Sequence, residues 1–244
     1  MTVHPAAGRL SPEMAAARDR AAQAAVALVE NGMIVGLGTG DTATRFIERL
    51  GRRVHDERLS IRCVVTSEAT AARAREHELP LGSLAELGRV DLAVDGADEV
   101  SARLDLLKGG GGAMTREKIV VASAQTFVVL VDEGKLVDVL GLKHPIPVET
   151  VPEAVALVTR RLEALGSKPG VRMATGSKPF VTDLGHHIVD ARFPGVEDPT
   201  QLNAALNDIP GVVGHGLFVG LATIVLVGAI GTPDVRRLAG GVRT

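Results

Sequence analysis

Residues 91–118 read DLAVDGADEVSARLDLLKGGGGAMTREK, and this stretch decides how the first half of the chain is interpreted. The short apolar run before Asp95 predicts a buried strand, and the loop that follows it contains Asp98. Lys108 precedes four consecutive glycines, and Glu117 follows them. Glycine loses more backbone freedom on folding than any other residue, so four in a row indicate a backbone that approaches a ligand closely.

Strand-like apolar runs alternate with helical segments on both sides of this stretch. The strand-like runs are Met33–Gly36, Ile61–Val65, Leu92–Val94 and Thr126–Val131, and helical patterns cover about 12–30, 42–50, 68–77 and 115–124. This alternation predicts a Rossmann-like α/β fold, in which a parallel sheet carries helices on both faces. Ligands of such sheets bind beyond the carboxyl ends of the strands. Polar segments directly follow the four expected strands, at 38–42, 66–70, 95–98 and 132–135.

The pattern changes after about Lys143, where prolines punctuate the chain. Helical patterns over 153–165 and about 200–207, with strand-like runs around 180–181, 187–193 and 212, predict a smaller α+β unit of ferredoxin-like type with antiparallel strands. The apolar run Ala222–Ala229 predicts a strand that returns to the first sheet. We therefore expect a catalytic domain formed by 1–143 and 217–244, with a small domain over 144–216 inserted before the C-terminal strand.

Composition and charge narrow the class of protein. The 244 residues carry a net charge of −2 and show no basic stripe, which argues against nucleic acid as a partner. No apolar run reaches the length of a membrane span, and the N-terminus lacks the hydrophobic core of a signal peptide. We expect residues 1–10 to be a frayed tail.

The single cysteine, Cys63, excludes an intramolecular disulfide and fits a reducing cytoplasm. It lies in the strand-like run IRCVV, so a buried structural thiol is favoured over a nucleophile.

The segment Gly38–Thr42, GTGDT, connects an expected strand to an expected helix. Backbone N–H groups at a helix N-terminus, together with small hydroxyl side chains, favour a phosphate group. The segment is neither a Walker loop nor a full dinucleotide fingerprint, and an ordinary tight turn is the alternative interpretation. Asp41 would oppose a phosphate if its carboxylate faced the ligand, unless it caps the helix and points away.

The four chemistry-bearing residues of 91–118 each have an ordinary alternative. Asp95 and Asp98 suit sugar hydroxyls because carboxylates accept several hydrogen bonds, but both residues also suit a turn. Lys108 can stabilise a developing anion, or it can be a surface lysine. Glu117 stands in a first helical turn, where an acid either complements the helix dipole or acts as a general base.

Taken together, these motifs resemble ribose-5-phosphate isomerase, type A. The resemblance rests on an ordered set that spans nearly the full chain: GLGTGDTA (36–43), VTSEAT (65–70), VDGADEV (94–100), KGGGGAMTREK (108–118), VDEGKLV (131–137), PIPVE (145–149), TDLGHHIVD (182–190) and GLF (216–218). Two positions depart from the family pattern, which commonly has Ser at Asp41 and usually Asn at His186.

The resemblance implies interconversion of D-ribose 5-phosphate and D-ribulose 5-phosphate in the non-oxidative pentose phosphate pathway, with no cofactor and no metal. It implies that Glu117 is the base in a cis-enediolate mechanism, that Lys108 stabilises the enediolate, and that Asp95 and Asp98 are catalytic carboxylates that position hydroxyls and relay protons. The substrate-binding residues it implies are Thr39, Gly40, Asp41, Thr42, Asp95, Gly96, Ala97, Asp98, Lys108, Gly109, Gly110, Gly111 and Lys135. It also implies a cytoplasmic homodimer or homotetramer.

Two other functions stay open from the residues alone. An amino-sugar phosphate isomerase-deaminase would use a similar sheet but would release ammonia. A non-catalytic sugar-phosphate sensor would generally carry a DNA-binding segment, and no basic helix-turn-helix pattern precedes Met33.

Overall fold

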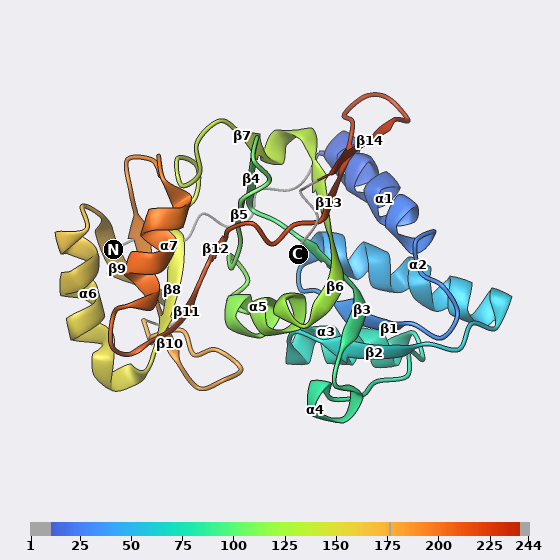
Figure 1. Ribbon diagram of the computed structural model, residues 1–244, viewed down its shortest axis with the longest axis horizontal. Coiled ribbons are helices and arrows are strands. Elements are labelled where there is room, and N and C mark those ends of the chain that lie inside the picture. Colours follow the sequence, from blue (N-terminus) through green and yellow to red (C-terminus); the bar gives the residue numbers. More distant parts are fainter. Residues whose placement is uncertain (1–10, 176, 240–244) are drawn as a thin grey trace. The chain divides into compact units, whose positions relative to one another are not determined.

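The computed structural model describes residues 11–175 and 177–239, so the expected N-terminal tail over residues 1–10 lies outside the described part. The chain forms two compact units (Figure 1). Among the described residues, the larger unit consists of 11–97, 116–136 and 220–239, and the smaller one of 98–115 and 137–219. The smaller unit thus contains the expected small domain together with 98–115, while the expected domain boundaries themselves stay a prediction.

A six-stranded sheet forms the centre of the larger unit, in the order β14–β13–β6–β3–β1–β2. Its strands are β1 (Ile34–Leu37), β2 (Arg62–Val65), β3 (Val90–Gly96), β6 (Ala124–Asp132), β13 (Ile224–Gly228) and β14 (Val235–Ala239). All neighbours pair in parallel except β14, which is antiparallel to β13. The structure confirms the expected parallel sheet and the returning strand within 222–229. Because the chain leaves β1 for β2 and then crosses back to β3, the strand order reverses between β1 and β3, where ligands of such sheets bind.

Helices lie on both faces of this sheet. The helices of the larger unit are α1 (Pro12–Val26), α2 (Asp41–Glu57), α3 (Glu68–Glu76) and α4 (Leu84–Leu87), and α5 (Met114–Ala122) begins in the smaller unit. Val35 and Leu37 of β1 pack into the same apolar core as Phe46 of α2. Gly36 between them faces the other way, where an added methyl would lie 2.7 Å from Val120 of α5. Alternation along β1 therefore assigns α2 and α5 to opposite faces.

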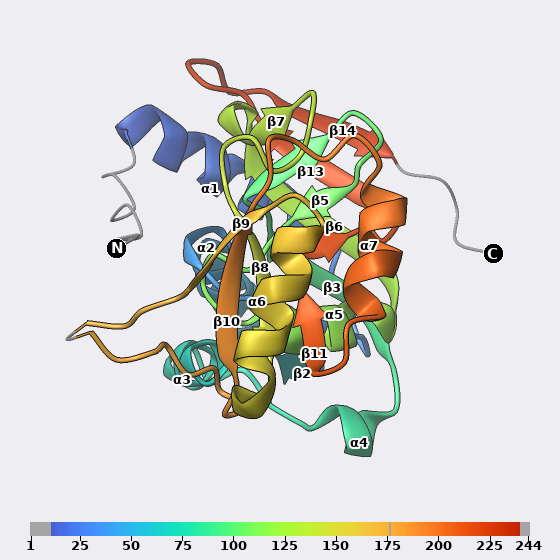
Figure 2. The ribbon, with the colours of Figure 1, turned by 90° about the vertical axis from the view of Figure 1, so that its left-hand side faces the viewer.

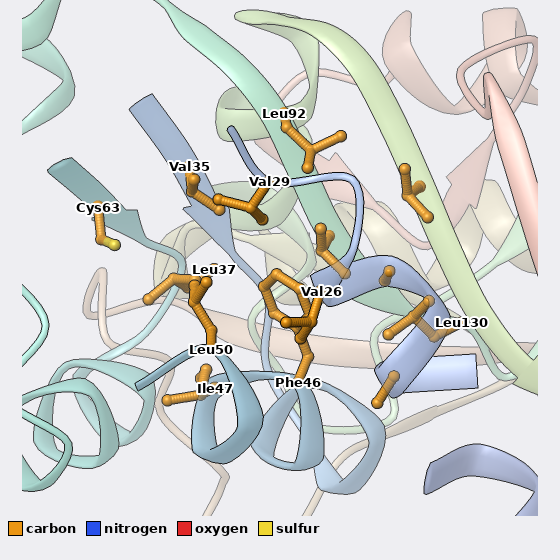
Figure 3. Packing of buried hydrophobic residues seen from close by; sticks show 14 of the residues in the cluster. Val26, Val29, Val35, Leu37, Phe46, Ile47, Leu50, Cys63, Leu92 and Leu130 are labelled. Atoms are coloured by element: carbon orange, nitrogen blue, oxygen red, sulfur yellow. The ribbon is translucent and has the colours of Figure 1, made fainter. Parts of the chain in front are cut away.

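The core of the larger unit forms where α1 and α2 pack against each other on one face of the sheet, with α1 over β6 and β13 (Figure 3). Phe46, Ile47 and Leu50 of α2 point towards Leu37 of β1 and Val26 of α1, and all are at most 3% exposed. Each such apolar side chain contributes about 1.5–3 kcal/mol when fully buried. These three residues lie within the helical pattern that the sequence predicted over about 42–50. Their burial fixes the helix above the sheet and holds its N-terminus at the end of β1.

The smaller unit contains an antiparallel sheet in the order β11–β8–β10–β9. Its elements are β8 (Ile146–Thr150), the 3₁₀ turn η2 (Pro152–Ala154), α6 (Val155–Ala164), β9 (Lys168–Val171), β10 (His187–Arg192), α7 (Pro199–Asn207) and β11 (Val212–His215). Both helices lie on one face of this sheet (Figure 2), where Val158 of α6 and Leu206 of α7 share a core with Val148 and Val189. The order β-α-β-β-α-β is that of ferredoxin-like units.

Short strands complete the smaller unit. β4 (Glu99–Ser101), β5 (Leu106–Leu107) and β12 (Leu217–Phe218) pair antiparallel, so that β5 lies between the other two. In the larger unit, the 3₁₀ turn η1 (Glu133–Lys135) follows β6, and the chain passes into the smaller unit within β7 (Leu136–Val137).

One expected strand was wrong. The run at 180–181 is not a strand, and the strand that pairs with β10 is β9, which reads KPGV. Strand propensity disfavours Pro and Gly, but β9 is the edge of its sheet, where a proline that cannot donate to the ladder is tolerated.

The described part of the chain contains no helix long and apolar enough to cross a membrane.

Candidate active site

The segment Gly38–Thr42, here called the hydroxyl loop, connects β1 to α2 in the larger unit as expected. Gly40 occupies the N-cap position of α2 with φ 103°, a conformation that favours glycine. Because glycine has no side chain, no side-chain hydrogen bond caps the N-terminus of α2. A helix N-terminus of this kind favours an anion.

A network of four hydroxyl groups links this loop to the segment that follows β2 and begins α3. The Oγ1 of Thr39 lies 2.8 Å from Thr66 Oγ1, 2.9 Å from Ser67 Oγ and 3.0 Å from Thr70 Oγ1. Thr70 also donates from its hydroxyl to the carbonyl oxygen of Gly38 at 2.8 Å. Thr66, Ser67 and Thr70 are all buried. The polar segment expected after the second strand therefore supports the first loop through neutral side chains.

Asp41 does not cap α2, so the capping alternative was wrong; it is the first residue of the helix, and glycine precedes it. Its carboxylate instead lies 3.2 Å from Arg45 Nε and 3.6 Å from Arg18 Nη1, and the side chain is half-exposed. Arg18 in turn contacts the fully buried Asp132 at 2.6 Å. The negative charge that the sequence placed beside the hydroxyl loop is thus balanced by two guanidinium groups.

Asp95 at the end of β3 is 2% exposed and contacts the hydroxyl loop. Its Oδ1 accepts hydrogen bonds from the backbone N–H of Thr39 at 3.2 Å and of Gly96 at 2.7 Å. A methyl group on Gly38 would lie 2.1 Å from the Cγ of Asp95, so only glycine fits there. The structure brings Asp95 and the loop together at the reversal point between β1 and β3.

Glu117 lies in the first turn of α5, as expected, and its side chain is buried. Its neighbours differ from each other: Arg116 forms an ion pair with Glu68 at 3.1 Å, whereas burial lowers the pKa of Lys118 to about 8. Lys135 lies in η1 after β6, half-buried.

Residues Lys108–Gly112, here called the glycine loop, belong to the smaller unit. Lys108 is 3% exposed; its backbone N–H donates to Gly216 at 2.8 Å, and its Nζ lies 5.5 Å from the centre of the Phe218 ring. Asp98 accepts a hydrogen bond from the N–H of Gly110 at 3.0 Å. Lys108 is therefore not the surface lysine of the alternative interpretation.

Two glycines of the loop adopt backbone conformations that other residues avoid. Gly109 has φ 98° and Gly112 has φ 82°. An added methyl would lie 2.6 Å from Pro147 at Gly109 and 2.7 Å from the Phe180 ring at Gly112. Local packing and torsion therefore require glycine at two positions of the run, Gly109 and Gly112.

Glu99, next to Asp98, has a structural role in the smaller unit. It is fully buried and accepts hydrogen bonds from the backbone N–H groups of Gly141 at 2.7 Å, Lys143 at 3.1 Å and His144 at 2.7 Å. Burial acts to raise its pKa, but the side chain of His144 and these N–H groups outweigh it and lower the pKa below its ordinary value.

Arg172 is the residue of this region that sequence reasoning missed. It follows β9, is 7% exposed, and donates to the carbonyl oxygens of Gly109 at 3.0 Å and Gly110 at 3.2 Å. It lies far along the chain from the glycine loop and belongs to no recognisable motif, so no signal in a single sequence could have found it.

Cys63, His186 and the possible metal ligands show no feature of a reactive site. Burial raises the pKa of the Cys63 thiol to about 12, which favours the structural interpretation over a nucleophile. His186 contacts Glu149 at 3.2 Å through Nδ1. Among the described residues no group of three or more His, Cys, Asp or Glu side chains has the geometry to hold a metal ion. The expectation that no cofactor or metal takes part stays a prediction.

Comparison with known proteins gives consistent matches. The family model for ribose 5-phosphate isomerase A (phosphoriboisomerase A) matches residues 62–231. A ribose-5-phosphate isomerase A from Synechococcus sp. is 47% identical over 86% of this chain and 91% of its own length. One from Thermosynechococcus vestitus is 48% identical over 89% and 94%.

Solved structures agree. A ribose 5-phosphate isomerase A from Methanocaldococcus jannaschii has a TM-score of 0.87 at 43% identity, covering 91% of this chain and 98% of that one. A D-ribose-5-phosphate isomerase in complex with phospho-erythronic acid has a TM-score of 0.88 at 42% identity, covering 91% and 97%.

Proposed function

The chain belongs to the ribose 5-phosphate isomerase A family and interconverts D-ribose 5-phosphate and D-ribulose 5-phosphate; from this premise we propose which of its residues perform the reaction. The observation that carries the proposal is the position of Glu117 in the first turn of α5. A carboxylate there is stabilised by the helix dipole, as a general base needs to be.

The hydroxyl loop binds the phosphate group in this proposal. The N-terminus of α2 supplies backbone N–H groups and a favourable dipole, and the hydroxyl network around Thr39 adds no charge that would repel a dianion. The loop residues contribute to phosphate binding mainly through their backbone N–H groups; these residues are Thr39, Gly40, Asp41 and Thr42. The carboxylate of Asp41 takes no part in this proposal, because it is paired with Arg45 and Arg18. Lys135 supplies a further positive charge.

Ring opening and proton transfer follow from the carboxylates and the lysine. Asp95–Asp98 and Lys108–Gly111 are the loops that hold the sugar. Asp95 and Asp98 position hydroxyls and relay protons while the aldose opens. Glu117 takes the proton from C2 and returns it to C1, and Lys108 stabilises the enediolate oxygen that carries the charge between these two steps. A positioned base of this kind contributes roughly 10²–10⁴-fold to the rate.

Phospho-erythronate is proposed as a ligand of this chain because a structure of a relative contains it. It carries a carboxylate where the substrate develops an enediolate, and a phosphate at the other end. Stabilisers of the enediolate oxygen should therefore also hold the carboxylate, which makes this acid a probe for the reacting state.

We also propose a homodimer or homotetramer in the cytoplasm that does not act on nucleic acid. The net charge of −2 and the lone buried thiol support the absence of a nucleic-acid partner and a reducing compartment.

Proton exchange in D₂O tests the roles of these residues. Wild-type protein with ribose 5-phosphate and EDTA should form ribulose 5-phosphate with deuterium at the exchanged carbon, as followed by ¹H NMR. We expect Glu117→Gln to fold normally but to lose about 10²–10⁴-fold in turnover and exchange. Glu30→Gln, at an exposed position of the same unit, is the matched control. Near-normal turnover by a folded Glu117→Gln protein would sink the assignment of the base.

A further inference from the structure

Arg172 is a buried charge in the smaller unit that the proposed mechanism does not use. Its Nε and Nη2 donate to the two carboxylate oxygens of Asp190 on β10, at 2.9 and 2.5 Å. Its plane also lies against the ring of Phe180, 5.9 Å from the ring centre. A buried guanidinium is costly unless it is paired, and a bidentate carboxylate is the arrangement that satisfies and orients it best.

The pairing with Asp190 leaves Nη1 directed at the glycine loop. Nη1 donates to the carbonyl oxygen of Gly109 at 3.0 Å and to that of Gly110 at 3.2 Å. The carbonyl of Gly109 also accepts from the N–H of Gly112 at 3.0 Å, so both of its lone pairs are used.

A single peptide group links this arginine to Asp98. The carbonyl of Gly109 and the N–H of Gly110 belong to one planar peptide and point in opposite directions. Arg172 holds the carbonyl end, and Asp98 accepts from the N–H end at 3.0 Å. Rotation of this peptide would release both contacts, and it would change the backbone torsions of Gly109, the residue that directly follows Lys108.

We propose that Arg172, oriented by Asp190, is a positioning residue for the isomerase reaction, because it clamps the Gly109–Gly110 peptide and thereby fixes Asp98 and Lys108. This inference rests on the proposed roles of Asp98 and Lys108. Arg172 does not itself contact the substrate in this account. Its effect is to preorganise the loop, which matters most when charge develops on the enediolate.

Arg172→Lys tests the clamp, because a lysine keeps the charge but lacks the fork that joins Asp190 to the two carbonyls. We expect kcat to fall by about 10- to 100-fold, the range in which small misplacements of catalytic groups act. The Kd of phospho-erythronate, measured by calorimetry, should rise by a similar factor, while the KM for ribose 5-phosphate changes much less. Arg160→Lys on the exposed side of α6 is the matched control.

Asp190→Asn provides a second route if Arg172→Lys does not fold. It keeps the size of the side chain but removes the charge that orients Arg172, so kcat and phospho-erythronate affinity should fall together by about 5- to 20-fold. The double variant should be no worse than Arg172→Lys alone, because Asp190 acts through Arg172.

A purely structural role predicts a different result. The thermal midpoint would fall, while kcat and the phospho-erythronate Kd of the folded protein would stay within about twofold of the Arg160→Lys values. That outcome, in either folded single variant, would overturn the proposal. The proposed role of Lys108 is tested separately, because its failure would show as near-normal turnover in a folded Lys108→Met protein.

Discussion

The hydroxyl loop and the glycine loop both present backbone beside proposed substrate groups, but different kinds of side chain hold them. The first loop is held mainly by neutral hydroxyls, among them Thr70 of α3, and the carboxylate of Asp95 accepts one of its backbone N–H groups. Charged groups, Arg172 and Asp98, hold one peptide of the second. A phosphate dianion is bound at the outset and changes little, so a mainly neutral support suffices, whereas charge that develops during the reaction needs fixed charges nearby. The comparison therefore assigns the hydroxyl loop to substrate binding and the glycine loop to the chemical step.

Among the variants that test the support of the two loops, the largest effect is expected from removing the charge of the glycine loop. Lys108→Met should lower kcat by about 10²–10³-fold, because the proposed stabiliser of the enediolate is lost in a water-poor setting. KM should change far less. Steady-state kinetics, with the exposed Lys168→Met as a control, checks this. An effect confined to KM would mean that Lys108 acts in substrate binding, and it would contradict the assignment of the glycine loop to the chemical step.

Glu99→Gln tests whether the buried charge of Glu99 stabilises the fold of the smaller unit. The amide nitrogen would face a buried backbone N–H, so unfolding free energy at pH 7 should fall by about 1–3 kcal/mol. Because the folded pKa of Glu99 is lowered, its contribution is present above the ordinary pKa of 4.5 and is lost as pH falls through the folded value. Urea unfolding should therefore show the gap between wild type and variant shrinking below about pH 4.5. A gap that is constant with pH would contradict the charged role.

Thr70→Val tests the neutral support of the hydroxyl loop. The carbonyl of Gly38 loses its donor and Thr39 loses one hydroxyl partner, so we expect a cost of about 1–2 kcal/mol. This should appear as a roughly tenfold rise in KM, with kcat nearly unchanged. Kinetics on Thr70→Val and on the exposed Thr200→Val would show it. A fall in kcat instead would mean that the hydroxyl loop takes part in chemistry.

The smallest effect is expected from Asp41→Ser. Arg18 and Arg45 already balance the carboxylate, and half-exposed ion pairs are worth little. KM should fall by less than about threefold, and the difference should shrink further as salt screens the charge. A large fall in KM would show that the carboxylate of Asp41 repels the phosphate despite its two arginine partners, and that phosphate binding is stronger when the hydroxyl loop carries no negative charge.

Much of the fold could be predicted because its signals are local. Short apolar runs, each followed by a polar segment, placed β1, β2, β3 and β6 and the loops at their carboxyl ends. Prediction failed where position in the sheet outweighed propensity. β9 contains Pro and Gly and pairs at an edge, while the apolar Phe180 packs against Arg172 and Gly112 outside any strand.

The sequence alone identified the reaction family, the parallel sheet and the residues proposed to carry the chemistry, because glycines, acids and lysines stand at fixed short spacings in the chain. How those residues are held becomes visible only in the folded molecule. It paired Asp41 with Arg18 and Arg45, turned Glu99 inwards, and set Arg172 against the carbonyls of a loop more than sixty residues away. Such contacts depend on which faces the folded chain buries, and a buried charge or carbonyl must find its partner wherever the fold supplies one.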